Sequence, residues 1–298
     1  PTMRTYLLFA LAILLASAVS AADWPMFRGN PGRTGSLPAT EAGTPLLPGA
    51  NAGSILWRIP TTWFVETTPA VSDGILYFGG GESVYAVDLA TGTLRWQFVA
   101  GDRVTSSPVV AQGTVFVGCD AGRLYAVDPS CGALKWRFLT GDAIRSPPAV
   151  AEGTVMFGSG DGNFYGVDAV TGKRRWKWAA DDRIDSSPLT SGTRVIFTSG
   201  TACLAVEIAT GCEGWRAEMG LEMRGNTPSL EDGIVCVGAG ETLFLLEEAT
   251  GAKVGEIAVP IFMQVPVIAQ GMVYFGAMGD DHVYGVDLAT RSVKWRTS

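Results

Sequence analysis

Six acidic residues recur at equivalent places in the chain, each four positions before a glycine or, in the last copy, before Arg291. They are Asp88, Asp128, Asp168, Glu207, Glu247 and Asp287. Six aligned carboxylates could form a ring of metal ligands. However, each one follows a strand-like run and opens a "D-x-x-T-G" turn, in which an Asp side chain accepts hydrogen bonds from turn amides and Gly supplies a positive φ. The pattern therefore favours turn caps over a metal site.

A second set of charged residues lies in the connections that read "TTWFVETTP", "AGDRVTSSP", "TGDAIRSPP", "ADDRIDSSP" and "GLEMRGNTP". In an extended chain, the residues five and three positions before each proline share one face. The fifth connection follows this pattern with a shift of one residue. The candidate site residues chosen from these connections are Glu66, Arg103, Arg145, Arg183, Asp185 and Arg224. They are expected to ring a channel mouth, either as an ordinary solvated funnel or as a site for a ligand or peptide.

The sequence predicts no catalytic, cofactor-binding or metal-ligating residue. His282 is the only histidine, no "GxSxG" nucleophile motif accompanies it, and we expect it to be exposed in a loop. The five cysteines show no "CxxC" or Cys/His metal spacing. Cys119 and Cys131 lie at opposite ends of one predicted strand, as do Cys203 and Cys212. We therefore expect mostly free, half-buried thiols rather than disulfides.

The elements that position these residues follow from a repeat of about forty residues. Tryptophans occur at positions 57, 96, 136, 176, 215 and 295, and Gly255 stands where the series would have another. Prolines recur with the same spacing. Each copy holds four short strand signals, which in the second copy cover 106–111, 114–118, 123–128 and 134–138. This predicts an all-β propeller of four-stranded antiparallel blades. The six blades are expected at about 67–98, 106–138, 146–178, 186–217, 226–257 and 265–296.

Each repeated tryptophan is expected on the outermost strand of its blade, packed against the next blade. One strand signal, 54–59, has the form of a fourth strand with no first three before it. A propeller commonly closes when an N-terminal strand completes the last blade. We therefore expect a C-terminally incomplete member of a family with seven or eight blades. A six-bladed ring with one surplus strand is the alternative.

Residues 1–22 are predicted to be a signal peptide, with one arginine, an apolar run and small residues before the cleavage site. A single membrane anchor is the alternative. Residues 23–53 are expected to be an extended segment, and the propeller then covers 54–298. No cysteine lies near the cleavage site, so a lipoprotein anchor is not expected. The protein is expected to be periplasmic or extracellular. The formal net charge of −7 argues against a nucleic-acid partner.

With these motifs, the chain resembles the PQQ-like β-propeller repeat family. The resemblance rests on "GTVFVGCDAGRLYAVDPSCGALKW" with its sibling repeats and on "DWPMFRGNPGRTG" at 23–35. In this family, quinoprotein dehydrogenases hold pyrroloquinoline quinone and calcium, whereas BamB-like members bind other proteins. The dehydrogenases carry adjacent cysteines, which this chain lacks. Because the sequence also lacks acid/base and metal constellations, we expect a non-catalytic propeller without a cofactor that binds another envelope protein or a small ligand. It is expected to be a monomer. The alternatives are a quinone-dependent dehydrogenase, or a fragment of one, and a sensor propeller cut from a larger protein.

Overall fold

A computed structural model describes residues 55, 57–61, 64–180, 182–223, 225–259, 262–263, 265–278 and 282–297. The predicted signal peptide at 1–22 and the extended segment at 23–53 lie outside these residues. Within them, all regular structure is β, and no helix is long and apolar enough to cross a membrane. The prediction of an all-β chain is confirmed.

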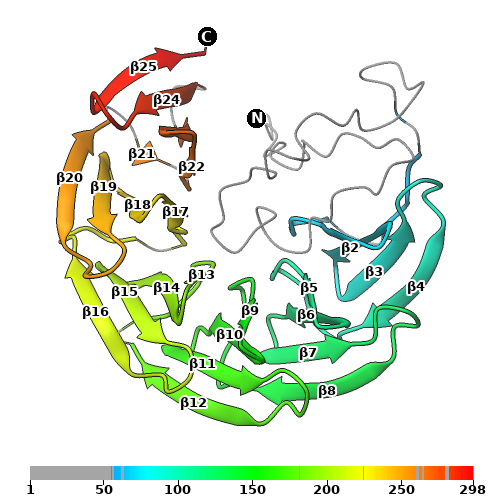
Figure 1. The fold of residues 1–298 in the computed structure, drawn as a ribbon. Helices are drawn as coiled ribbons and strands as arrows, with labels where there is room; N and C mark the ends of the chain where they lie inside the picture. Colours follow the sequence, from blue (N-terminus) through cyan, green and yellow to red (C-terminus); the bar gives the residue numbers. More distant parts are fainter. Residues whose placement is uncertain are drawn as a thin grey trace, which may run out of the picture.

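The strands form six antiparallel sheets, each built from strands that follow one another along the chain. Figure 1 shows these sheets as blades arranged in an arc, with β5, β9, β13 and β17 toward the middle and β4, β8, β12, β16, β20 and β25 on the perimeter. The predicted propeller of four-stranded blades is confirmed. The path from the inner strand to the outer strand is the same in every blade.

The first three blades have these bounds: β1 (Ala70–Ser72), β2 (Ile75–Gly80), β3 (Ser83–Asp88) and β4 (Leu94–Val99); β5 (Val109–Ala111), β6 (Thr114–Gly118), β7 (Arg123–Val127) and β8 (Leu134–Leu139); β9 (Ala149–Ala151), β10 (Thr154–Gly158), β11 (Asn163–Asp168) and β12 (Arg174–Ala179). The last three are β13 (Leu189–Ser191), β14 (Arg194–Ser199), β15 (Ala202–Glu207) and β16 (Glu213–Glu218); β17 (Ser229–Glu231), β18 (Ile234–Ala239), β19 (Thr242–Glu247) and β20 (Lys253–Ala258); β22 (Val267–Ala269), β23 (Met272–Met278), β24 (Val283–Asp287) and β25 (Ser292–Arg296). In the sixth sheet, the short β21 (Phe262–Met263) also pairs with β23.

In the second blade the inner strand is shorter than the sequence predicted, and the serine at its expected start bonds to the next blade. In the second blade the strand was expected to begin at Ser106 but begins at Val109. The buried Ser106 hydroxyl donates to the carbonyl of Ser146 at 3.1 Å, and the Ser146 hydroxyl donates to the carbonyl of Ser186 at 2.7 Å. Pro108 has no N–H for a ladder bond. These hydroxyls therefore connect successive blades near the middle of the arc.

Hydrophobic cores lie between neighbouring blades as well as within them. One core joins Tyr77, Val84 and Trp96 of the first blade to Val115 and Tyr125 of the second. Further cores join the later blades in the same way. Because each blade buries one face of its sheet against the next, the blades stabilise one another along the arc.

The repeated tryptophans hold these junctions together, as predicted. At five junctions the indole Nε1 donates to a carbonyl of the next blade at 2.7–3.0 Å, from Trp57, Trp96, Trp136, Trp176 and Trp215. The ring also lies against the turn glycine of that blade. A Cβ built on Gly92, Gly132, Gly172, Gly211 or Gly251 would come within 2.5–2.9 Å of the tryptophan before it. The turn therefore needs Gly both for its positive φ and for this close approach.

The repeated Asp side chains cap their own turns, which confirms the turn interpretation. Asp168 accepts hydrogen bonds from the amides of Val170 and Thr171 and from the Thr171 hydroxyl, at 2.8–3.2 Å. Asp88 makes an equivalent cap, and hydrogen bonds from Arg95 and Thr91 lower its pKa to about 2. In the fourth blade, Glu207 instead accepts from Arg194. These carboxylates act within their own blades, so they form no common site.

The junction between the fifth and sixth blades is built differently. Gly255 stands where the other blades have Trp, and Arg291 stands where they have the turn Gly, with a φ of 53°. The two exceptions meet, because a Cβ on Gly255 would lie 3.2 Å from Arg291 Cζ. Arg291 Nη2 donates to the carbonyl of Val254 at 2.9 Å. The bond therefore runs from the later blade to the earlier one, the reverse of the tryptophan bonds.

The strand expected at 54–59 does not form over its described residues, and this corrects the sequence prediction. Residues 57–61 belong to none of the sheets, because none of the described strands runs beside them to supply ladder bonds. Trp57 nevertheless contacts the first blade as its counterparts contact theirs, donating to the carbonyl of Leu89 at 3.0 Å. The Trp57 side chain therefore makes the same contact as the other repeated tryptophans, although its backbone is not part of a strand.

The Trp–Gly contact predicts a difference between two glycines with nearly the same backbone. Gly211 has φ +74° and its Cβ position lies 2.7 Å from Trp176, whereas Gly233 has φ +75° and nothing within 4 Å of its Cβ position. Gly211→Ala and Gly233→Ala both strain the backbone, but only the first presses on the indole. We expect Gly211→Ala to cost about 1–3 kcal/mol more than Gly233→Ala in urea unfolding. Equal costs would contradict a role for the contact.

The contact between Gly255 and Arg291 predicts that substitutions at these two positions have strongly coupled effects on stability. Gly255→Trp alone places an indole in the space that Arg291 fills, and we expect it to destabilise the protein. Adding Arg291→Gly restores the arrangement of the other junctions. A double-mutant cycle in urea should give a favourable coupling energy of at least about 1 kcal/mol. Additive effects would show that the two positions are independent.

Candidate functional site

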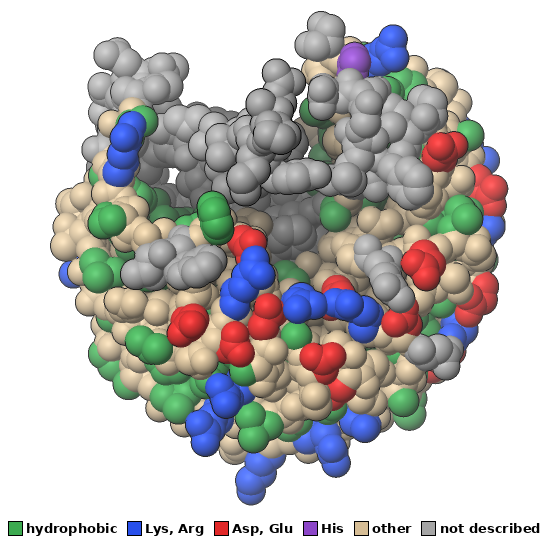
Figure 2. All heavy atoms as spheres, turned by 180° about the vertical axis from the view of Figure 1, so that it is seen from behind, with side chains coloured by type: hydrophobic (Ala, Val, Ile, Leu, Met, Phe, Trp, Pro, Cys, Tyr) green, Lys and Arg blue, Asp and Glu red, His purple; other side chains and the backbone are tan. Residues whose placement is uncertain are grey.

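The predicted site residues lie in the connections that lead to the inner strands. Arg103 lies between β4 and β5, Arg145 between β8 and β9, and Arg183 and Asp185 between β12 and β13. Figure 2 shows Lys and Arg side chains gathered toward the middle of one face, with Asp and Glu side chains beside and around them. We call the six side chains of Glu66, Arg103, Asp120, Arg145, Arg183 and Asp185 the mouth cluster.

The first pair in the mouth cluster joins two blades. Arg103 Nη2 donates to both carboxylate oxygens of Glu66, which lies before the first inner strand. The arginine side chain is 56% exposed and the glutamate 38% exposed. Because both groups are so exposed, the pair orients the side chains but contributes little to stability.

The second pair depends on a residue that the sequence analysis did not select. Asp120, in the turn between β6 and β7, accepts hydrogen bonds from Arg145 Nε at 3.1 Å and from the Thr105 hydroxyl at 2.9 Å. Its amide donates to the carbonyl of Arg103 at 2.9 Å. The hydrogen bond from Arg145 to Asp120 raises the pKa of Arg145. Asp120 therefore ties the connections of the second and third blades together.

The third pair lies within one connection. Arg183 Nε donates to Asp185 Oδ2 at 2.7 Å. The other oxygen, Asp185 Oδ1, is buried and has no hydrogen-bond partner. The negative charge of Asp185 also acts on Arg145 and helps to raise its pKa. The charges therefore follow one another from blade to blade rather than forming isolated pairs.

The structure thus brings five of the six predicted residues into one cluster, and the sixth, Arg224, lies outside the described residues. The missed residue, Asp120, had a usable signal. At the same point of the hairpin, the neighbouring repeats have Gly81, Gly160 and Gly200, so Asp120 is another place where the copies differ.

The mouth cluster does not fit a calcium-bound quinone. Calcium takes six to eight oxygen ligands, and no group of three or more His, Cys, Asp or Glu side chains suited to a metal occurs within the described ranges. Each carboxylate of the cluster is engaged by a guanidinium, which a cation would have to displace. The expectation that the protein binds no cofactor remains a prediction.

The other reactive side chains lie apart from the mouth cluster. All five cysteines are free, but they are not half-buried as expected. Cys119, Cys203 and Cys236 are buried in the cores between blades, where burial raises the pKa of Cys203 to about 12, whereas Cys131 and Cys212 are exposed on turns. His282 is half-buried near Tyr284 rather than exposed, with 6.3 Å between ring centres.

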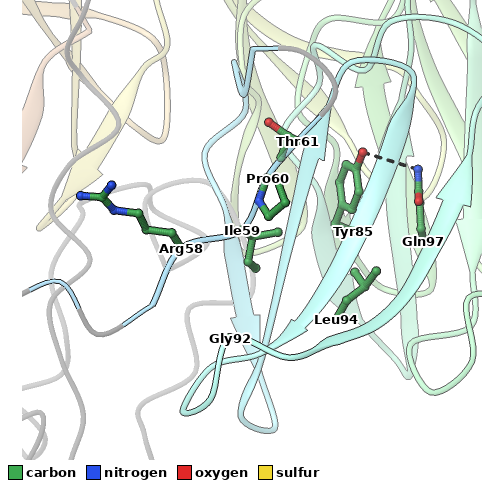
Figure 3. Close-up of a pocket in the computed structure, with 8 residues that line it drawn as sticks. All are labelled: Arg58, Ile59, Pro60, Thr61, Tyr85, Gly92, Leu94 and Gln97. Atoms are coloured by element: carbon green, nitrogen blue, oxygen red, sulfur yellow. Dashed lines mark hydrogen bonds between the residues drawn. The ribbon is translucent and has the colours of Figure 1, made fainter.

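A pocket of about 520 Å³ lies between residues 58–61 and the first blade. Figure 3 shows the Tyr85 hydroxyl directed at Gln97, while Arg58 points away from the other labelled side chains. At the next two junctions, Phe98 and Phe138 pack on the tyrosine equivalent to Tyr85. Here the smaller Ile59 takes that place. The pocket lies beside this smaller side chain, and its polar lining groups come from Arg58, Thr61, Tyr85 and Gln97.

Fold and site together define a β-propeller whose inner connections carry a paired cluster of arginines and carboxylates. The sequence profile of one family, described as outer membrane protein assembly factor BamB, matches residues 39–137 and 199–298. This is more than half of the chain, so the chain belongs to that family. A search among curated proteins found no match.

Solved structures share the fold at low identity. BamB from Moraxella catarrhalis is 18% identical with a TM-score of 0.71, over 84% of this chain and 81% of that chain. The quinohemoprotein alcohol dehydrogenase ADHIIG from Pseudomonas putida HK5 is 17% identical with a TM-score of 0.73, over 89% of this chain and 57% of that one. The corresponding enzyme from Comamonas testosteroni is 16% identical with a TM-score of 0.76, over 94% and 67%. At these identities the likeness concerns the fold alone.

Substitutions at two adjacent residues, Arg145 and Ser146, should differ in their effect on the free energy of unfolding, because only the second residue is part of the scaffold. Arg145→Gln removes an exposed ion pair and should change the free energy of unfolding by less than about 1 kcal/mol. Ser146→Ala removes the buried hydroxyl that donates to the Ser186 carbonyl at 2.7 Å, and should cost about 1–3 kcal/mol. Urea unfolding of the two variants tests this order. The reverse order would mean that the mouth cluster is structural.

Proposed function

We propose that the protein is an exported, non-catalytic propeller that binds another envelope protein through its mouth cluster. Membership of the BamB family supports this role, because that family is described by its part in outer membrane protein assembly. The observation that carries the proposal is an exposed aromatic side chain beside paired charges. Phe64 is 78% exposed and lies two residues before Glu66, which pairs with Arg103.

This combination is typical of a protein-binding surface. Aromatic residues and arginines account for much of the binding energy at protein interfaces, and charged groups around them fix the orientation of the partner. Val65, beside Phe64, is 39% exposed and adds to the apolar surface. A channel mouth that served only as a solvated funnel would gain nothing from an exposed phenylalanine.

A quinone-dependent dehydrogenase is the second candidate, favoured by the fold that the chain shares with two quinohemoprotein alcohol dehydrogenases. The engaged carboxylates of the mouth cluster argue against it, since they offer no free set of oxygens to calcium. The two candidates differ in one assay. Reduction of a dye by alcohols or sugars, after pyrroloquinoline quinone and Ca²⁺ are added to the protein, would overturn the binding role.

The binding role predicts crosslinking at one exposed position and not at another. A photo-crosslinking amino acid at Phe64 should capture an envelope protein in the native host, because this side chain lies beside the mouth cluster. The same amino acid at Val170, which is 80% exposed in a turn between β11 and β12, is the matched control. Immunoblots after irradiation would show the products. Equal products at both positions, or none at Phe64, would contradict the proposal.

A further inference from the structure

We infer that the mouth cluster recognises an acidic polypeptide segment, whose carboxylates bind the arginines Arg103, Arg145 and Arg183. This inference rests on the proposed function, because it names the chemistry of the partner at the same site.

The arginines of the mouth cluster reach solvent more than its carboxylates do. In each pair the arginine is more exposed than its carboxylate: 56% against 38% for Arg103 and Glu66, 43% against 18% for Arg145 and Asp120, and 34% against 19% for Arg183 and Asp185. A partner that approaches this face therefore meets guanidinium groups before it meets carboxylates.

Two arginines of the mouth cluster use only part of their hydrogen-bonding capacity within it. A guanidinium has five N–H donors. Arg145 and Arg183 each use Nε for their carboxylate, at 3.1 and 2.7 Å, and this leaves both terminal NH₂ groups for a partner. By contrast, Arg103 engages both oxygens of Glu66, and Asp120 Oδ1 already accepts two hydrogen bonds. The unpartnered acceptor Asp185 Oδ1 is buried, so the terminal donors of Arg145 and Arg183 are the groups that a partner in solvent can reach.

The hydrogen bonds through Nε also orient the guanidinium groups of Arg145 and Arg183. A guanidinium held through Nε keeps its two terminal nitrogens side by side, which is the arrangement that binds a carboxylate through two parallel hydrogen bonds. The anchoring carboxylates also restrict the side-chain motion that binding would otherwise have to freeze. The internal carboxylates therefore orient the arginines toward an acidic partner, although together with Asp142, whose charge also acts on Arg145, they outnumber the arginines.

The net charge of −7 does not prevent this binding. At physiological ionic strength the Debye length is about 8 Å, so charges on the far side of the molecule are largely screened. Short-range hydrogen bonds at the cluster then decide which partner is held. The exposed ring of Phe64 provides an apolar contact at the edge of the cluster for the same segment.

The test uses the full chain and two labelled peptides, one alternating Gly and Glu and the other alternating Gly and Lys, measured by fluorescence anisotropy. We expect the Glu peptide to bind and the Lys peptide not to bind. Combining Arg145→Gln with Arg183→Gln should lower the affinity for the Glu peptide at least about tenfold, since each hydrogen bond to a charged group contributes on that order. Arg137→Gln, an exposed position on β8, is the matched control and should leave binding unchanged.

Arg145→Lys is a second variant that keeps the charge but loses the capacity for bidentate hydrogen bonding. We expect it to lower the affinity for the Glu peptide less than the Gln variants do. Circular dichroism of every variant checks its fold. Preference for the Lys peptide, binding of neither peptide, or equal binding by the Gln variants would each overturn the inference. Inorganic phosphate is the further probe, and its binding in place of the Glu peptide would also overturn it. If Phe64 crosslinks to a partner while the Glu peptide fails, only the inference fails and the proposed function stands.

Discussion

The contact between a tryptophan of one blade and the turn glycine of the next is the constraint on which this fold depends. It combines three requirements at one place: a positive φ, room for an indole, and a carbonyl that accepts its N–H. A single repeat unit of this kind cannot bury its hydrophobic face alone and depends on its neighbours to cover it. The contact therefore makes each blade part of the core of its neighbour.

This arrangement separates stability from recognition along the chain. Near the middle of the arc, buried serine hydroxyls join one blade to the next, while the charged side chains of the same connections reach solvent. Ser146 and Arg145 are adjacent, yet the first is fully buried and the second is half exposed. The scaffold can hold its shape while the exposed positions change. This fits the general observation that one fold can carry different functions on its exposed positions.

Much of this could be predicted from the sequence, because repetition reports directly on physical needs that recur. The regular spacing of the tryptophans predicted the blades, and the "D-x-x-T-G" motif predicted the turns between their outer strands. Two things could not be predicted. The serines looked like strand residues, because hydroxyl bonds to the next blade leave no periodic signal. The position of Asp120 could have been found, because neighbouring repeats have glycine there, but its bond to Arg145 of the following repeat leaves no pattern within one repeat.

The exchange of Gly255 and Arg291 has a consequence for how such proteins diversify. The two changes lie in different blades but in one contact, with 3.2 Å between the Cβ position of Gly255 and Arg291 Cζ. The residues that must remain compatible therefore belong to two blades rather than one. We call this contact a joint: it begins in the outer strand of one repeat and ends in the turn of the next. Recombination that breaks the chain between blades would separate the halves of a joint. Only a break between the turn glycine and the tryptophan of one blade, such as between Gly92 and Trp96, would keep both halves of each contact together. New combinations of blades are therefore expected to tolerate breaks best at that point.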